Sequence, residues 1–198
     1  MRRLIITTII LFMAAIAITV VYFKNLNTSG LHTSQTMSTI PNNTALVFEF
    51  NNDDGFYDIF KDNKLFAAVI GKKQIDELDT LRSQLLGNQG LKNFFTGQNT
   101  FISLHPLKDH TVALLITIAA TKNFNAEEIG KLPRQANKGL LVSAVNIDGK
   151  KGYTIYSGSL KKRFYLINKE DGIFTGSFSK ELIDQSARYV PNKDKKLF

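Results

Sequence analysis

The chain begins with its longest apolar segment, which runs from Leu4 to Phe23 without a charged residue. Two arginines precede this run and Lys24 follows it. A helix of twenty residues, rising about 1.5 Å per residue, spans the roughly 30 Å hydrocarbon core of a bilayer. The three threonines of the run can bond to helical carbonyls. The pattern therefore predicts a transmembrane signal-anchor over residues 1–24, which would contact the lipid bilayer through residues 4–23.

A cleaved secretory signal is the alternative interpretation of the same segment, since Ala15-Ile16-Ala17 matches the small-residue cleavage pattern. Apolar residues continue after Ala17 as far as Phe23, which favours a retained anchor. Arg2 and Arg3 outnumber the single lysine on the far side, so the positive-inside rule places the N-terminus in the cytoplasm. We therefore expect a single-pass protein of the inner (cytoplasmic) membrane with its C-terminal domain in the periplasm.

The next residues, 25–41, are polar and rich in Ser, Thr and Asn, which predicts a stalk before a domain over residues 42–198. In the domain, short blocks of β-branched and aromatic residues alternate with turn signals. Asp148-Gly149 and Asp171-Gly172 are typical of tight hairpin turns. The expected strands cover residues 44–50, 100–105, 111–118, 139–147, 152–156, 163–167 and 173–176.

Helices are predicted where apolar residues recur at three- and four-residue steps. The clearest case runs from Ile75 to Leu86, with Gly87 at the position of a left-handed C-cap. Asn125 and Ser179 each follow a phenylalanine and precede a helical pattern, which indicates N-caps with hydrophobic staples. Shorter helical segments are expected through residues 56–60 and 91–95.

Strands that follow one another through tight turns pair antiparallel, so these elements predict an α+β fold. We expect a largely antiparallel sheet of six or seven strands with the helices packed mainly on one face. The chain stops at Leu197-Phe198, two apolar residues after a charged turn, where a further strand would begin. This ending indicates that the native chain is longer than these residues.

The amino-acid composition indicates the cellular compartment of the protein but does not identify a binding partner. The chain has no cysteine, which excludes a disulfide framework, a thiolate metal site and an acylated anchor, and is compatible with a bacterial envelope. The net charge of +8 includes Arg2, Arg3 and Lys24, which leaves +5 for the exported part. This modest excess favours anionic surfaces only weakly.

The three histidines are the first candidates for acid–base or metal chemistry. His32 lies in the expected stalk, which cannot hold it in place. His105 and His110 flank a hairpin turn where Asp109 could join them on a metal ion, but structural zinc takes four ligands and no fourth is evident. We therefore interpret them as polar residues of an exposed turn and predict no metal site.

Other motifs favour ordinary structural roles. The sequence has neither a G-x-S-x-G nucleophile elbow nor a phosphate-binding glycine loop, so no catalytic or cofactor-binding residue is predicted. Lys150-Lys151 and Lys161–Arg163 lie among tyrosines, a pattern that can bind polyanions but also occurs in solvated turns at sheet edges. On the extracytoplasmic side of the membrane, such polyanions would be anionic glycans or lipid headgroups rather than nucleic acid.

Several segments carry a resemblance to a known family: the N-terminal anchor, Ile40-Pro41-Asn42 before a strand, Gly97-Gln98-Asn99 before another, and Gly152-Tyr153 with Phe174–Ser179. In these the chain resembles, over nearly its whole length, an uncharacterised family of membrane-anchored envelope proteins of Bacteroidetes-type bacteria. The resemblance implies a longer chain and no assigned activity.

We therefore expect a protein that is not an enzyme and that serves scaffolding or binding in the bacterial cell envelope, with other envelope proteins or anionic glycans as partners. Two alternatives remain open. The domain binds an apolar or lipidic ligand between sheet and helices, as its phenylalanine-rich helices suggest, or it is the non-catalytic part of a longer envelope enzyme.

Overall fold

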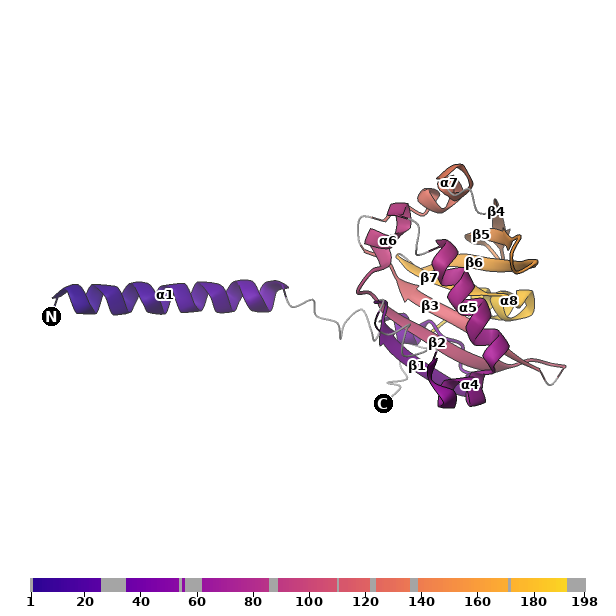
Figure 1. Cartoon of the computed structure of the whole chain (residues 1–198), viewed down its shortest axis with the longest axis horizontal. Helices are drawn as coiled ribbons and strands as arrows, with labels where there is room; N and C mark the ends of the chain where they lie inside the picture. Colours follow the sequence, from indigo (N-terminus) through magenta and orange to yellow (C-terminus); the bar gives the residue numbers. More distant parts are fainter. Residues whose placement is uncertain are drawn as a thin grey trace.

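The computed structural model describes residues 2–25, 35–53, 55, 62–85, 89–109, 111–121, 124–135, 139–170 and 172–191. Helix α1 (Arg2–Asn25) lies apart from the sheet (Figure 1). Its side chains are described from Ile6 to Val21, and all of these are exposed. Over the residues that the structure describes, none of the helices combines the length and the apolar character that crossing a membrane requires.

Seven strands form one antiparallel sheet in the order β1-β2-β3-β7-β6-β5-β4. Pairing of β3 with β7 joins a three-stranded part, β1 to β3, to the four-stranded meander β4 to β7. The turn between β4 and β5 holds Asp148 at φ 46° and Gly149 at φ 78°, the left-handed conformations of a two-residue hairpin turn. The strands are β1 (Leu46–Asn51), β2 (Asn99–Pro106), β3 (Val112–Ala119), β4 (Leu140–Ile147), β5 (Lys150–Ser157), β6 (Lys162–Glu170) and β7 (Ile173–Ser177).

The α+β class and the strands expected from the sequence are confirmed. The main difference is β6, which continues to Glu170, beyond the expected end at Ile167, through a register shift between Asn168 and Glu170. The extra residues place Lys169 inside the protein, where it is 2% exposed.

Among the described residues, helices α4 to α8 flank the sheet, and two of them carry the expected N-caps. Ser179 Oγ accepts a hydrogen bond from Leu182 N at 3.3 Å, and Asn125 Oδ1 accepts one from Glu127 N at 2.9 Å. The expected helix through residues 56–60 and the expected cap at Gly87 lie outside the described residues. The helices are α4 (Lys64–Ile70), α5 (Lys72–Leu85), α6 (Gln89–Phe95), α7 (Glu127–Gln135) and α8 (Lys180–Arg188).

The helices divide unequally between the two faces of the sheet, as Figure 1 shows for α5 in front and α8 behind. Apolar residues of α4 to α7 pack on the face that carries Ile102, Ile118 and Phe174. Helix α8 packs on the opposite face, against Leu115 and Ile167. Among the described residues, α4 to α7 therefore cover one face of the sheet and α8 covers the other.

Residues 35–41, at the end of the expected stalk, lie against the domain. They form a helical turn in which Thr36 and Thr39 are 0% exposed. Asn43 Nδ2 donates to Gln185 Oε1 of α8 at 3.1 Å, and Tyr189 donates its hydroxyl to Asn42 at 2.9 Å. The last residues of the expected stalk therefore contact the folded domain.

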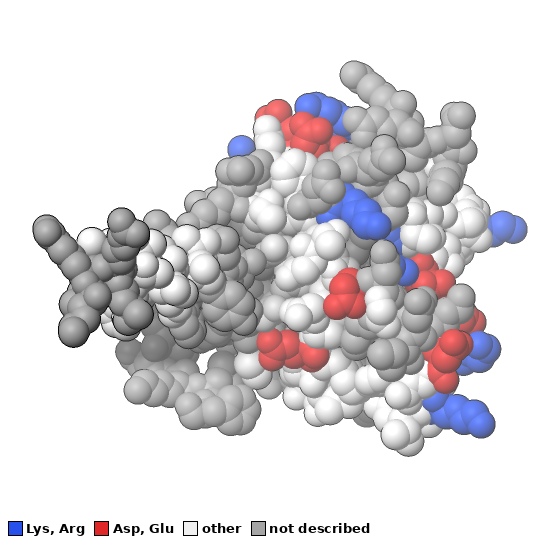
Figure 2. All heavy atoms as spheres, turned by 60° about the vertical axis from the view of Figure 1, so that its left-hand side comes forward, with Lys and Arg blue, Asp and Glu red and all other residues white. Residues whose placement is uncertain are grey.

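The described charged residues are mixed in sign on the face shown in Figure 2, where lysines and arginines alternate with aspartates and glutamates. Several of them pair with each other, including Lys180 with Asp184 at 2.8 Å and Lys131 with Glu128 at 2.5 Å. A mixed surface of this kind favours solubility rather than attraction to a polyanion.

Candidate functional site

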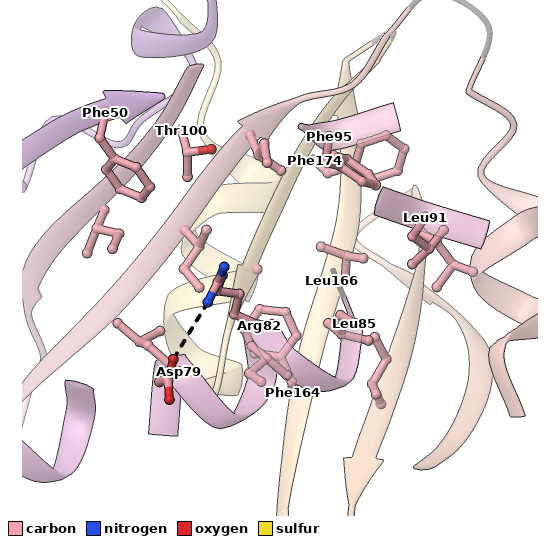
Figure 3. A pocket seen from close by; sticks show the side chains of 18 of the residues that line it. Phe50, Asp79, Arg82, Leu85, Leu91, Phe95, Thr100, Phe164, Leu166 and Phe174 are labelled. Atoms are coloured by element: carbon pink, nitrogen blue, oxygen red, sulfur yellow. Dashed lines mark ion pairs between the residues drawn. The ribbon is translucent and has the colours of Figure 1, made fainter. Parts of the chain in front are cut away.

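A cavity of about 90 Å³ lies between α5 and the sheet (Figure 3). Its walls are aliphatic and aromatic side chains from α5, α6, α7 and the strands. Asp79 and Arg82 are the charged residues in this lining, and Thr100 contributes the hydroxyl. Apolar concave spaces with a few polar groups at one side are the usual form of small-ligand sites.

The cavity lies where two apolar clusters meet under α5. Ile75 and Leu78, in the first half of the helix, belong to one cluster, while Leu81 and Leu85 belong to the other. Ile116, at the middle of β3, is only half-buried and packs against both clusters. Because neither cluster covers Ile116 completely, an open space remains above it.

Half-burial at this place in a sheet is unusual. Strand β3 lies between β2 and β7, and β6 lies between β7 and β5, so both are inner strands. Even so, Leu114, Ile116 and Leu166 are only half-buried on the face that the helices cover. Each square ångström of apolar surface left exposed forgoes about 25 cal/mol of stabilisation. This surface is therefore available to an apolar ligand.

The floor of the cavity depends on a glycine. A Cβ at Gly176 would lie 2.3 Å from Phe164 Cζ, so the phenylalanine ring can occupy its position only over a glycine. The same ring meets Phe178 edge-on, with centroids 5.2 Å apart. On the other side, Phe95 and Phe174 form a second edge-on pair at 6.2 Å. Edge-on aromatic pairs of this kind contribute about 0.5–1.5 kcal/mol each beyond the area that they bury.

Polar contacts hold α5 over the cavity. Lys162 Nζ of β6 pairs with Glu77 Oε1 of α5 at 2.5 Å, and Gln84 Nε2 donates to Ser159 Oγ at 2.7 Å. Asp79 and Arg82, which line the cavity, form a longer ion pair of 3.9 Å with side chains 34% and 22% exposed. The helix is therefore fixed along one side by direct bonds.

A second candidate lies on the opposite face, around His105. This residue is 0% exposed, so our interpretation of it as part of an exposed turn is wrong. Its Nδ1 lies 3.0 Å from Asn43 Oδ1, and its Nε2 lies 2.8 Å from Ser103 Oγ and 3.3 Å from Thr44 Oγ1. Since Asn43 offers an oxygen, Nδ1 carries the proton and Nε2 accepts from Ser103 Oγ, whereas Thr44 Oγ1 donates its one proton to Pro41 O at 2.6 Å.

The order Ser103–His105–Asn43 matches the hydrogen-bond order of a nucleophile, its base and an orienting group. However, Ser103 and His105 are both 0% exposed, so a substrate reaches neither unless residues 35–44 are displaced. Burial also lowers the pKa of His105 to about 4, which keeps the imidazole neutral. The network therefore attaches the segment before β1 to the sheet.

The structure also contains a buried lysine that sequence reasoning did not single out. Lys169 Nζ donates to the carbonyls of Ser186 and Tyr189, at the end of α8. A cation at this end is favourable because helical carbonyls make it partly negative. Burial, with the nearby ammonium of Lys150, lowers the pKa of Lys169 to about 8. The sequence signal for its burial was the alternation of Tyr165, Ile167 and Lys169, which places all three side chains on the same face of one strand.

The remaining candidates have local roles. Asp109 accepts hydrogen bonds from Thr111 N at 3.0 Å and Thr111 Oγ1 at 2.6 Å, as in a turn. His32 and His110 lie outside the described residues. Among the described residues no group of three or more histidines and carboxylates is placed to hold a metal ion. Of the basic residues that could bind a polyanion, Lys150 and Lys151 with Lys161–Arg163, Lys150 donates from Nζ to Lys169 O at 3.0 Å.

No protein-family model matches the chain, and comparisons with curated proteins and with solved structures find no match either.

Proposed function

We propose that the protein is a membrane-anchored binding protein of the bacterial envelope, and that its α+β domain binds a single acyl chain in the cavity beneath α5. The observation that carries the proposal is the half-buried apolar surface on inner strands, centred on Ile116. The domain acts as a binder and carrier rather than as a catalyst.

The size of the cavity supports a narrow ligand. An engineered apolar cavity of about 150 Å³ holds one benzene ring, so about 90 Å³ accepts the end of a chain rather than a ring system. At about 24 cal/mol per Å³, keeping this volume empty costs roughly 2 kcal/mol. A methyl-terminated chain recovers part of that cost, and the rest of the ligand extends past Asp79 and Arg82 to the solvent.

The membrane anchor that the sequence predicts is part of this proposal, because it would account for where such a ligand comes from. Apolar side chains stand exposed along α1, including Phe12 at 67% and Ile18 at 70%, a pattern that favours contact with lipid over water. The uncharged run extends from Leu4 to Phe23, and the arginines before it favour a cytoplasmic N-terminus. Anchoring keeps the domain close to a pool of acyl chains.

Photochemical labelling tests the binding proposal directly. The full chain in lipid nanodiscs is illuminated with a fatty acid that carries a diazirine at its methyl end, and mass spectrometry locates the labelled residues. We expect labels on Leu78, Ile116 and their neighbours in the cavity. Ile116→Phe fills the space and should reduce this labelling about tenfold, equivalent to about 1.4 kcal/mol of binding free energy.

Val112→Phe is the matched control. Val112 lies on the same strand and face as Ile116 but is 56% exposed at the strand end, so labelling should persist. Leu78→Ala enlarges the cavity and should increase labelling although it lowers the stability by about 2–5 kcal/mol. Equal labelling of Ile116→Phe and Val112→Phe, or labels confined to α1, would contradict binding and leave a scaffolding role.

A further inference from the structure

Strand β4 forms one edge of the sheet, and no described strand pairs with its outer side. It pairs with β5 along its whole length, from Leu140 with Ser157 to Ile147 with Lys150, without a bulge. Its outer row of backbone N–H and C=O groups is therefore straight and regular. An edge of this kind is a template for another strand.

Proteins usually protect such edges with charges, prolines, bulges or short strands. Strand β4 has eight residues, Leu-Leu-Val-Ser-Ala-Val-Asn-Ile, and none of them is charged or a proline. The opposite edge strand, β1, has only six residues and carries Glu49. On β4 the apolar side chain of Leu141 is 66% exposed. The β4 edge is therefore less protected against pairing with another strand than the β1 edge.

The order of side chains along β4 indicates which partner fits. In an antiparallel pair, directly opposite residues lie on the same face of the sheet. If β4 pairs with a second β4 about a two-fold axis at Ser143, then Leu141 meets Val145 and Val142 meets Ala144 of the other copy. The serines meet each other, and Leu140 meets Asn146. A shift that centres the pair on Ala144 would instead oppose Val142 with Asn146 and Ser143 with Val145.

From this self-matching sequence we propose that two copies of the chain associate through β4, antiparallel and centred on Ser143, into one continuous sheet of two domains. The uncharged strand produces no like-charge repulsion across the axis, and the pairing covers Leu141 on each copy. A two-fold contact of this kind is closed and does not extend into fibres. The proposal stands on the edge strand alone and is independent of ligand binding in the cavity.

Disulfide trapping tests the register because the chain has no cysteine of its own. In the proposed register the two Ser143 residues face each other with Cα atoms about 4.5–5.5 Å apart, within the range of about 4.4–6.8 Å that a disulfide spans. Oxidation of Ser143→Cys in the full chain, in membranes at low protein density, should therefore give covalent dimers.

Two single-cysteine variants serve as controls. Ala144→Cys lies next to Ser143 and is also exposed, but in this register its two copies are offset along the strands and should cross-link poorly. Leu65→Cys, at a position that is 76% exposed far from β4, measures random collision. Cross-linking at Ser143 well above both controls supports the proposal.

Equal cross-linking at positions 65 and 143, or stronger cross-linking at 144, would overturn the proposed pairing. A second measurement needs no cysteine. Leu141→Lys places one ammonium on each copy against the apolar side chain of Val145 of the other copy, which desolvates an unpaired charge. Light scattering should therefore show the full chain in detergent shifting from dimer to monomer. Leu65→Lys should leave the mass unchanged. A wild-type chain that is monomeric at every concentration would also overturn the proposal.

Discussion

Protonation of His105 should control how the stability of the domain depends on pH. The folded pKa is about 4 against an ordinary value of 6.5, because burial disfavours the charged imidazole. Between these two values the unfolded chain binds more protons than the folded one, so stability falls as the pH falls from 6.5 towards 4. A difference of 2.5 in pKa, at about 1.36 kcal/mol per unit, gives a loss of about 3 kcal/mol.

The comparison is between the wild type and His105→Gln, which keeps a donor for Asn43 but does not titrate. Equilibrium urea unfolding of the full chain in a non-ionic detergent, followed by tyrosine fluorescence, gives the unfolding free energy at each pH. Carboxylates are the same in both proteins, so the difference between the two profiles isolates the histidine. Profiles that stay parallel from pH 7.5 to pH 4 would refute the burial argument and favour an exposed histidine.

Three further predictions concern the buried side of the sheet. Gly152→Ala places a Cβ 2.2 Å from the carbonyl oxygen of Leu166 and should destabilise the domain by about 1–3 kcal/mol. The control, Gly130→Ala, meets only an ordinary contact at 3.6 Å and should be neutral or stabilising. Denaturant unfolding measures both variants, and equal effects would contradict the close approach of the strands at Gly152. Stability should rise by about 3 kcal/mol as the pH rises from 8 to 10.5, because the folded pKa of Lys169 is lowered to about 8, and Lys169→Met should abolish this rise in the same unfolding assay. Gly176→Ala should displace Phe164 and lower both the melting temperature and photolabelling of the cavity; a change in neither would show that the ring does not depend on the glycine.

The strands and turns could be predicted from the sequence because the patterns that indicate them involve only neighbouring residues. Asp148-Gly149 indicates a hairpin turn by itself, and the structure places both residues at positive φ. Ser179 likewise indicates its cap by its own side chain and the helix that follows. Such features depend on a few neighbouring residues, so one sequence is sufficient to predict them.

The buried polar residues could not be predicted in the same way. His105 stands at the end of a strand beside a turn, and its buried ring contacts Asn43 and Thr44, which lie about sixty residues earlier in the chain. The cavity is also a non-local property, because it depends on how far large side chains hold α5 from the strands. The phenylalanine-rich pattern suggested an apolar site between sheet and helices, but it did not indicate Ile116 as its centre.

The most direct test of the central claim is methyl NMR of the full chain in nanodiscs under xenon, a small apolar probe that enters dry cavities. Ile116, Leu78 and Leu166 line the space beneath α5, so their methyl signals should shift and saturate as xenon pressure rises. Exposed Val112 and Leu141 should shift little and without saturation. Saturable shifts absent from Ile116 and its neighbours would contradict the proposed binding site.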